Sequence, residues 1–285
     1  MAIQTAATTE LDEAQRVIIA RARFTQEHNA VMLSLVEHFT LGKGEKQLTI
    51  PKVGQMTAAD LTDGTDMTAS AAIGMTASQI DCEEVGLKVI ITDKLARQLN
   101  EDVFAMIGRQ VGDAMGRKKD GDLLALLSSL SLGDSAGDET VSLARYAASA
   151  TLLQAVPVPL PIYAVLHPYQ SHLLKIAVAV SGVYPIPDSG LTVDMIKQWK
   201  AGQWAGVPCF EDGNIDITTV SGIGHGGMFS KSALGYLQSL ADTTERERDA
   251  SLRATELVIV SDYEAFAIDN GYGVDMYYLA AAPAV

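Results

Sequence analysis

Gly133, Ser135 and Gly137 match the G-x-S-x-G pattern of a serine hydrolase. That pattern works only as a strained strand-to-helix turn that exposes the serine. Here it follows a predicted helix and stands in a Gly/Asp/Ser-rich segment, so a flexible connection is the better interpretation. Hydrolysis through Ser135 is kept as a distant alternative, which loss of activity on replacement of Ser135 by Ala would support.

A second stretch, with Gly222, Gly224 and Gly227, fits the G-x-G-x-x-G pattern, and Glu245 follows it further along the chain. A dinucleotide-binding fingerprint needs a strand before the glycines and a helix after them, within one βαβ unit. The residues after Gly227 have the pattern of a strand, and nothing beyond them completes the unit. We therefore expect no dinucleotide cofactor.

Metal-binding patterns are incomplete as well. Asp212, Asn214 and Asp216 alternate as in a calcium loop, but no glutamate stands at the closing position, so a turn is expected. His167 and His172 are too far apart to share a helical face. The sequence thus predicts no catalytic residue, no cofactor and no metal, which favours a structural role.

The composition also favours a structural role. The chain has 285 residues, of which 48% are hydrophobic and 20% charged, so it can fold around a sizeable core. Its net charge of −14 opposes tight binding to phosphate backbones and argues against a dedicated DNA-binding protein, but it is compatible with a wall that encloses DNA. Reduced Cys82 and Cys209 are favoured over a disulfide. No membrane-spanning helix is expected.

The longest predicted element is a helix from Asp102 to Leu130. Val103, Ile107, Val111 and Met115 recur at steps of three and four and form one apolar stripe. Unbroken, such a helix spans about 43 Å (~1.5 Å per residue) and exceeds the usual globular length. The alternative is an ordinary core helix that breaks near one of its glycines.

Before this helix, the segment 52–79 is rich in Ala, Thr, Gly, Ser and Asp. Strands at Leu48–Val53 and Ile80–Ile91 flank it, which predicts a long hairpin that reaches away from the body. A hairpin alone is only marginally stable in water, so we expect this one to lie on another chain.

The remaining elements alternate without a regular βαβ period, which is typical of the α+β class. We expect an N-terminal arm with helical segments over Leu11–Phe39 and a charged loop at Thr243–Asp249. The other expected helices are Ser142–Ala155, Pro168–Val180 and Leu191–Trp199. The other expected strands are Ile162–His167, Gly206–Glu211, Ile215–Val220, Met228–Leu237, Leu252–Ser261 and Tyr272–Leu279.

This order of elements resembles the major capsid proteins of tailed bacteriophages, which have the Hong Kong 97 fold. The resemblance covers about Leu48–Leu279. Its most specific part runs from LTIPKVGQMTAADLTDGTDMTASAAI through EEVGLKVIITDKLARQLNEDVFAMIGRQVGDAMGRKKDGDLLALL. In that family a hairpin called the E-loop leads into a strand and then into the long spine helix of the peripheral domain. YAVLHPYQ, AGVPCFEDGN and GMFSKSALGYL are similar to the family's later segments.

The resemblance implies a homo-oligomeric icosahedral shell of pentamers and hexamers that encloses double-stranded DNA without sequence-specific binding. It further implies a virion capsid that assembles in the cytoplasm of a host bacterium, with portal, scaffolding and decoration proteins as further partners and no membrane. An encapsulin-like nanocompartment, whose shell has the same fold and encloses cargo enzymes, is the alternative.

Mapped on the family, the chain divides into segments with distinct roles. These are an N-terminal arm (1–46), the E-loop hairpin (47–85), the peripheral domain with the spine helix (86–132), the axial domain (133–234), the returning peripheral strands (235–262) and a C-terminal axial strand (263–285). Because only 47 residues precede Leu48, we expect scaffolding to come from a separate protein or from the arm itself.

The candidate functional residues are therefore inter-subunit contacts. We expect them in the hairpin, at Asp60, Asp63 and Asp66, and in the charged segment, at Glu245, Arg246, Glu247 and Arg248. A solvated turn is the alternative for the charged segment. Lys52 is the only lysine between Leu48 and Ile80 and stands at the base of the hairpin, so the lysine–asparagine crosslink of some family members is not expected.

Overall fold

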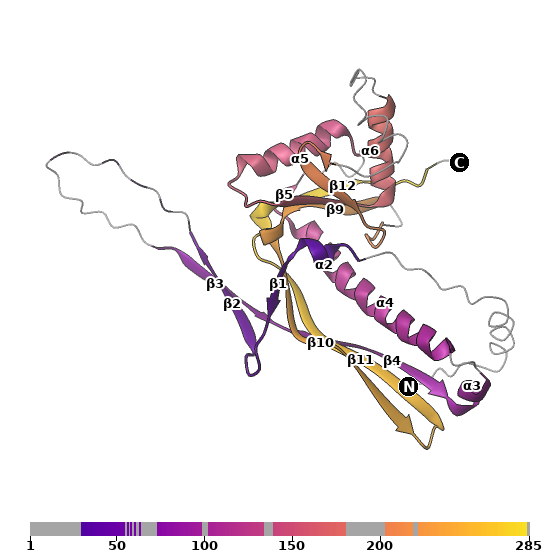
Figure 1. Ribbon diagram of the computed structural model, residues 1–285. Helices are drawn as coiled ribbons and strands as arrows, with labels where there is room; N and C mark the ends of the chain where they lie inside the picture. The colour runs from indigo at the N-terminus through magenta and orange to yellow at the C-terminus, as the bar shows by residue number, and fades with distance from the viewer. Residues whose placement is uncertain are drawn as a thin grey trace.

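The computed structural model consists of two sheets, a projecting hairpin and one long helix (Figure 1). Among the described residues the strands form a four-stranded sheet, called here the long sheet, a six-stranded sheet, called here the broad sheet, and a two-stranded hairpin. The structure describes residues 30–54, 56, 58, 60, 63, 73–98, 102–133, 139–180, 203–218 and 222–283.

The long sheet has the strand order β1-β10-β11-β4. Its strands are β1 (Glu37–Thr40), β10 (Leu234–Asp249), β11 (Ala254–Ala267) and β4 (Glu83–Thr92). Strand β11 pairs antiparallel with both β10 and β4, whereas the short β1 pairs parallel with the first residues of β10. The long strands make an elongated platform (Figure 1).

Helix α4 (Asp102–Ala125) lies along this platform and continues as a 3₁₀ turn, η1 (Leu126–Ser129). The predicted spine helix is thus confirmed, with its last turn wound more tightly than an α-helix. Val111 and Met115 of the predicted stripe are buried against Ile259 of β11. One apolar stripe is enough to pack the helix on the sheet, because only one side of the helix contacts the sheet.

The broad sheet has the strand order β5-β12-β9-β6-β8-β7. Its strands are β5 (Leu132–Gly133), β12 (Gly273–Leu279), β9 (Ile223–Ser230), β6 (Ile162–Leu166), β8 (Val207–Glu211) and β7 (Gln203–Trp204). Helices α5 (Leu143–Ala155) and α6 (Pro168–Val180) accompany it. Tyr146 and Leu153 of α5 pack in one core with Val274 and Tyr278 of β12.

The two sheets meet at the end of the spine helix. Leu127 is fully buried there, in a core that also contains Phe229 of β9 and Leu234 of β10. A Cβ atom at Gly227 would lie 2.7 Å from Cδ2 of Leu127, so the absence of a side chain on this strand lets the leucine approach the sheet. The helix terminus therefore joins the two halves of the subunit.

The hairpin consists of β2 (Gln47–Val53) and β3 (Met75–Asp81), which pair antiparallel. Its second strand therefore lies earlier than the predicted Ile80–Ile91, most of which is β4, paired with β11 in the long sheet. Figure 1 shows it reaching away from both sheets. The remaining short elements are α2 (Met32–Leu35), α3 (Asp93–Gln98), η2 (Lys231–Ala233) and η3 (Asn270–Tyr272).

Several predicted elements are corrected. The helical arm does not extend to Phe39, because residues 37–40 form strand β1, whose backbone is satisfied by pairing with β10. The predicted strand Met228–Leu237 is interrupted by η2, and Ile215–Val220 contributes only an isolated bridge at Ile217 in its described part. The predicted helix Leu191–Trp199 lies outside the described residues. The α+β class with the order of the other elements is confirmed.

The junction predicts a large stability effect for one side chain. Replacing Leu127 by Ala should lower the free energy of unfolding by about 2–5 kcal/mol, because it removes a fully buried side chain and leaves a cavity between the sheets. Leu160→Ala is the matched control, since Leu160 is 81% exposed and its loss should change stability by about 0.5 kcal/mol or less. Chemical denaturation measures both, and equal effects would contradict the assigned junction.

Candidate inter-subunit surface

The hairpin carries apolar side chains that the described part of the subunit leaves in solvent. Every residue of β3 except one is exposed, and β2 is at most half-buried. The largest exposed hydrophobic residues at its outer end are Val53, Met56, Ile73 and Met75, each more than half exposed. Exposed apolar patches of this kind mark sites of contact with other proteins.

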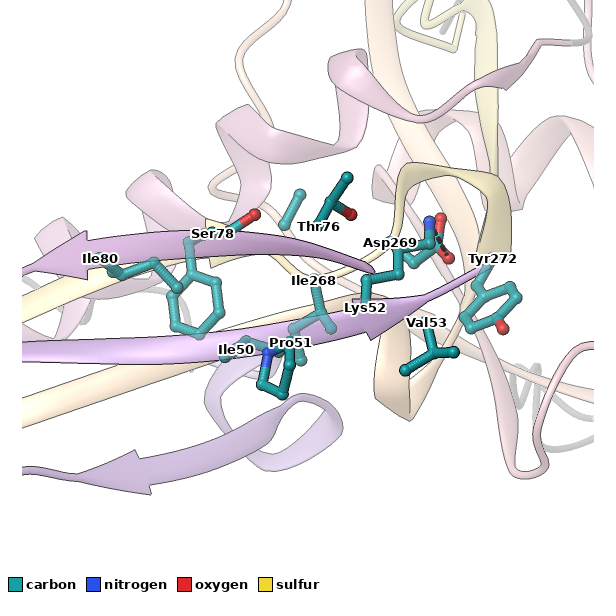
Figure 2. A pocket seen from close by; sticks show the side chains of 12 residues that line it. Ile50, Pro51, Lys52, Val53, Thr76, Ser78, Ile80, Ile268, Asp269 and Tyr272 are labelled. Atoms are coloured by element: carbon teal, nitrogen blue, oxygen red, sulfur yellow. Dashed lines mark ion pairs between the residues drawn. The ribbon is translucent and has the colours of Figure 1, made fainter. Parts of the chain in front are cut away.

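The hairpin is held against the body by an ion pair close to the ends of its two strands where the loop begins. Lys52 Nζ on β2 lies 2.5 Å from Asp269 Oδ2, which precedes η3, and Figure 2 shows the two side chains reaching toward one another. The same aspartate accepts the backbone N–H of Gly271 through Oδ1 (3.0 Å). Because Lys52 is 59% exposed, the pair contributes about 1 kcal/mol or less and serves mainly to orient the hairpin.

A cavity of about 290 Å³ lies beside this ion pair, between the hairpin and the end of the long sheet (Figure 2). Ile50 and Ile80 line it from the hairpin, and Phe266, Ile268 and Tyr272 line it from the body. The hairpin is therefore not packed tightly on its own subunit.

The acidic candidates of the hairpin lie in its outer segment. Asp60 and Asp63 are exposed, and Asp66 lies outside the described residues. The hairpin and the far end of β10 point in different directions in Figure 1, so the structure does not bring the two predicted groups of charged residues together within one subunit.

The charged segment is not a loop, as the sequence predicted, but the outer half of strand β10. Glu245 pairs with Val258 and Arg248 with Thr255, in continuous antiparallel register. The alternating apolar residues of β11 bind the segment into the sheet, which polarity alone did not reveal. The turn falls later, where Asp249 accepts the backbone N–H groups of Ser251 and Leu252. The Ser251 hydroxyl, which also donates to Asp249 Oδ1 at 2.6 Å, lowers the pKa of Asp249 most, and the two backbone N–H groups lower it further.

One edge of this outer half is open. Strand β1 pairs only with Gly235–Gln238, so in the described parts of the chain no strand pairs with Leu240–Asp249 on the side away from β11. Charged side chains on an open edge oppose unwanted strand pairing. Glu245, Arg246 and Glu247 are exposed along it.

Arg248 differs from its neighbours because it has a partner in its own chain. Its Nη1 and Nη2 donate to the two carboxylate oxygens of Asp93 at 3.0 and 2.9 Å. This forked contact lowers the pKa of the Asp93 carboxyl and fixes the start of α3 to β10. Arg246 is thus a better reporter of inter-subunit contact than Arg248.

The alternative chemistries of the sequence gain no support. Gly224 and Gly227 lie within strand β9, so no helix follows them as a dinucleotide site requires. Ser135 lies outside the described residues. Within the described ranges there is no group of three or more His, Cys, Asp or Glu side chains that could hold a metal ion, and no helix long and apolar enough to cross a membrane. Cys82 and Cys209 are free thiols.

The spine helix, the platform, the broad sheet and the projecting hairpin define the Hong Kong 97-type fold of tailed-phage capsid proteins, as comparison with solved structures confirms. The chain is similar to a structure of Mycobacterium phage Che8 (16% identity, TM-score 0.72, 90% of this chain and 94% of that chain covered). It is also similar to the capsid of the cyanophage P-SCSP1u (14% identity, TM-score 0.71, 92% of each chain covered).

A third similar structure is the SrpI encapsulin complex from Synechococcus elongatus (10% identity, TM-score 0.63, 96% of each chain covered). No protein-family model matches the chain, and no curated protein matches it by sequence. The fold is thus conserved in these structures where sequence identity is 16% or lower.

The contrast between the two arginines gives a testable prediction. Arg248→Glu should lower the melting temperature of the subunit, because it places two carboxylates together at Asp93. Arg246→Glu should leave the melting temperature unchanged and reduce the yield of assembled particles. Differential scanning calorimetry and size-exclusion chromatography measure the two effects. If Arg246→Glu assembles normally, this edge does not form a contact between subunits.

Proposed function

We propose that the chain is a major capsid protein that self-assembles into an icosahedral shell of pentamers and hexamers around the double-stranded DNA of a tailed phage. The observation that carries this proposal is the hairpin. It projects from a body with a capsid fold, and its outer apolar side chains have no described core of their own. Such an element gains stability only when a neighbouring copy covers it.

The contacts proposed between copies lie at two separate places. The hairpin offers Val53, Met56, Ile73 and Met75 together with the acidic Asp60, Asp63 and Asp66. The outer half of β10 offers Glu245, Arg246, Glu247 and Arg248. Many contacts of modest strength, repeated by symmetry, stabilise a closed shell. The proposal includes the division of the chain into an N-terminal arm, a peripheral domain and an axial domain.

The net charge of the chain fits a shell that encloses DNA better than a protein that binds DNA tightly. With a net charge of −14, a shell wall repels phosphates overall and leaves the packaged DNA free of sequence-specific contacts. Portal, scaffolding and decoration proteins are the further partners that this function requires. A structural role also explains why the sequence motifs for catalysis are incomplete.

An encapsulin-like nanocompartment is the second candidate, because the encapsulin structure covers the chain as completely as the phage structures do. The phage structures have the higher TM-scores. The two functions differ in the contents of the shell. Particles from the native source that hold nuclease-protected double-stranded DNA would support the capsid, whereas protein cargo would support the nanocompartment.

Assembly tests the proposal directly. The purified full-length protein should form closed particles visible by negative-stain electron microscopy. Met75→Asp should abolish them and leave the subunit folded, because Met75 is 62% exposed and supports no core of the subunit. Leu152→Asp is the matched control, an exposed apolar residue on α5 that should affect assembly less. Normal particles from Met75→Asp would remove the hairpin from the interface.

The absence of a covalent crosslink is a separate prediction. Lys52, the hairpin lysine, is engaged with Asp269 of its own chain. Boiled particles should therefore run as a single band of about the monomer mass of 30.3 kDa on denaturing gels. A ladder of covalently linked subunits would contradict this prediction.

A further inference from the structure

Two buried carboxyl groups meet where three segments of the chain converge. Asp120 on the spine helix is fully buried, and Asp212, at the end of β8, is 1% exposed. Asn214 bridges the two carboxyl groups, because its backbone N–H donates to Asp212 and its side-chain amide donates to Asp120, each at 2.9 Å. The third segment is the start of α2, where the backbone N–H of Met32 donates to Asp120.

Most of the oxygen atoms in this pair have donors. Asp120 Oδ1 accepts the N–H of Met32 at 3.0 Å, and Asp120 Oδ2 accepts from Asn214 Nδ2 at 2.9 Å. Asp212 Oδ1 accepts the backbone N–H of Asn214 at 2.9 Å. Asp212 Oδ2 is buried and lacks a hydrogen-bond partner. A buried acceptor without a donor destabilises the folded state, and more so if it is charged.

The missing donor can be a proton. Two ionised carboxylates in contact inside the protein would repel each other, whereas a neutral Asp212 donates its O–H to the Asp120 carboxylate. No cation performs this task in the described surroundings. Asp120 is the titratable group that faces Asp212. The start of α2 and the turn after β8 contribute N–H donors, and the carbonyl of Leu166 in β6 accepts the backbone N–H of Asp212.

His167, which follows β6, contacts its own helix, where its Nδ1 accepts the N–H of Tyr169 at 3.1 Å.

We propose that Asp120 and Asp212 share one proton, and that this proton links the start of α2 to both the spine helix and the β8 end of the broad sheet. Loss of the proton to solvent leaves two adjacent carboxylates and loosens this junction.

The direction of the pH dependence follows from burial. Burial raises the pKa of Asp212, and the neighbouring Asp120 carboxyl raises it further, whereas the unfolded chain ionises near the ordinary aspartate value of ~3.9. Folding therefore retains a proton that the unfolded chain releases. Stability from this pair is full below the unfolded pKa and falls as pH rises toward the raised folded pKa, by up to about tenfold in the unfolding equilibrium constant per pH unit.

Asp212→Asn tests the inference because it keeps the shape of the neutral acid and supplies a permanent N–H donor to Asp120. Unfolding of the full-length, unassembled protein by urea should be measured between pH 5 and 9, with tryptophan fluorescence as the signal. Wild type should lose stability from pH 5 to about pH 7, where the raised pKa of Asp212 lies, and change little from this pair above it. The fall in stability with pH should be smaller in Asp212→Asn, by up to about tenfold in the unfolding equilibrium constant per pH unit. At pH 8 the variant should be more stable than wild type.

Asp216→Asn is the matched control, since it removes the same charge from an exposed position of the same loop and should leave the pH slope of wild type unchanged. Asp120→Asn should be less stable than Asp212→Asn, because an amide cannot accept from both Met32 and Asn214 while donating to Asp212. Amide hydrogen exchange of residues 30–36, corrected for intrinsic rates, should speed up with pH in wild type and not in Asp212→Asn.

The outcomes separate a shared proton from an ordinary buried contact. An Asp212→Asn slope equal to that of wild type or of Asp216→Asn overturns the inference, and so does failure of Asp212→Asn to fold. None of these measurements depends on shell assembly, so the result stands apart from the proposed function.

Discussion

The subunit depends on one constraint, which is that a single helix must serve two sheets. The apolar stripe of α4 packs on the long sheet through Val111 and Met115, and the continuation of the helix ends in the core beneath the broad sheet at Leu127. Burial along this helix therefore sets the relative placement of both halves and, through β4, the position from which the hairpin departs.

Elements with a strong local pattern could be predicted from the sequence. The spine helix, α5 and α6 appeared at nearly the observed boundaries because periodicity, the Ser142 N-cap and Pro168 mark them. The order of these elements also sufficed to recognise the fold. The outer half of β10 could not be predicted, because its residues are polar and only pairing with β11 makes them a strand. Strand β1 could not be predicted for the same reason, because its partner strand β10 lies far away in the sequence.

The candidate surface was predictable in outline and not in detail. An Ala/Thr/Gly-rich hairpin without a core predicted contact with another chain, but the exposed Val53, Met56, Ile73 and Met75 were not singled out, because isolated apolar residues in a polar segment carry no periodic signal. The intrachain partner of Arg248 and the Asp120–Asp212 pair join residues far apart in the sequence. Such pairings become visible only after folding.

The open edge of β10 limits the ways in which copies of this subunit can join. In an antiparallel pair of identical strands, opposed side chains point to the same face of the sheet, and alternate residues of one strand point to opposite faces. Two such edges would therefore bring Glu245 opposite Glu247 in one register, or Arg246 opposite Arg248 in the next allowed one. Each of these registers sets like charges together, so the strand discourages endless extension of the sheet into fibres.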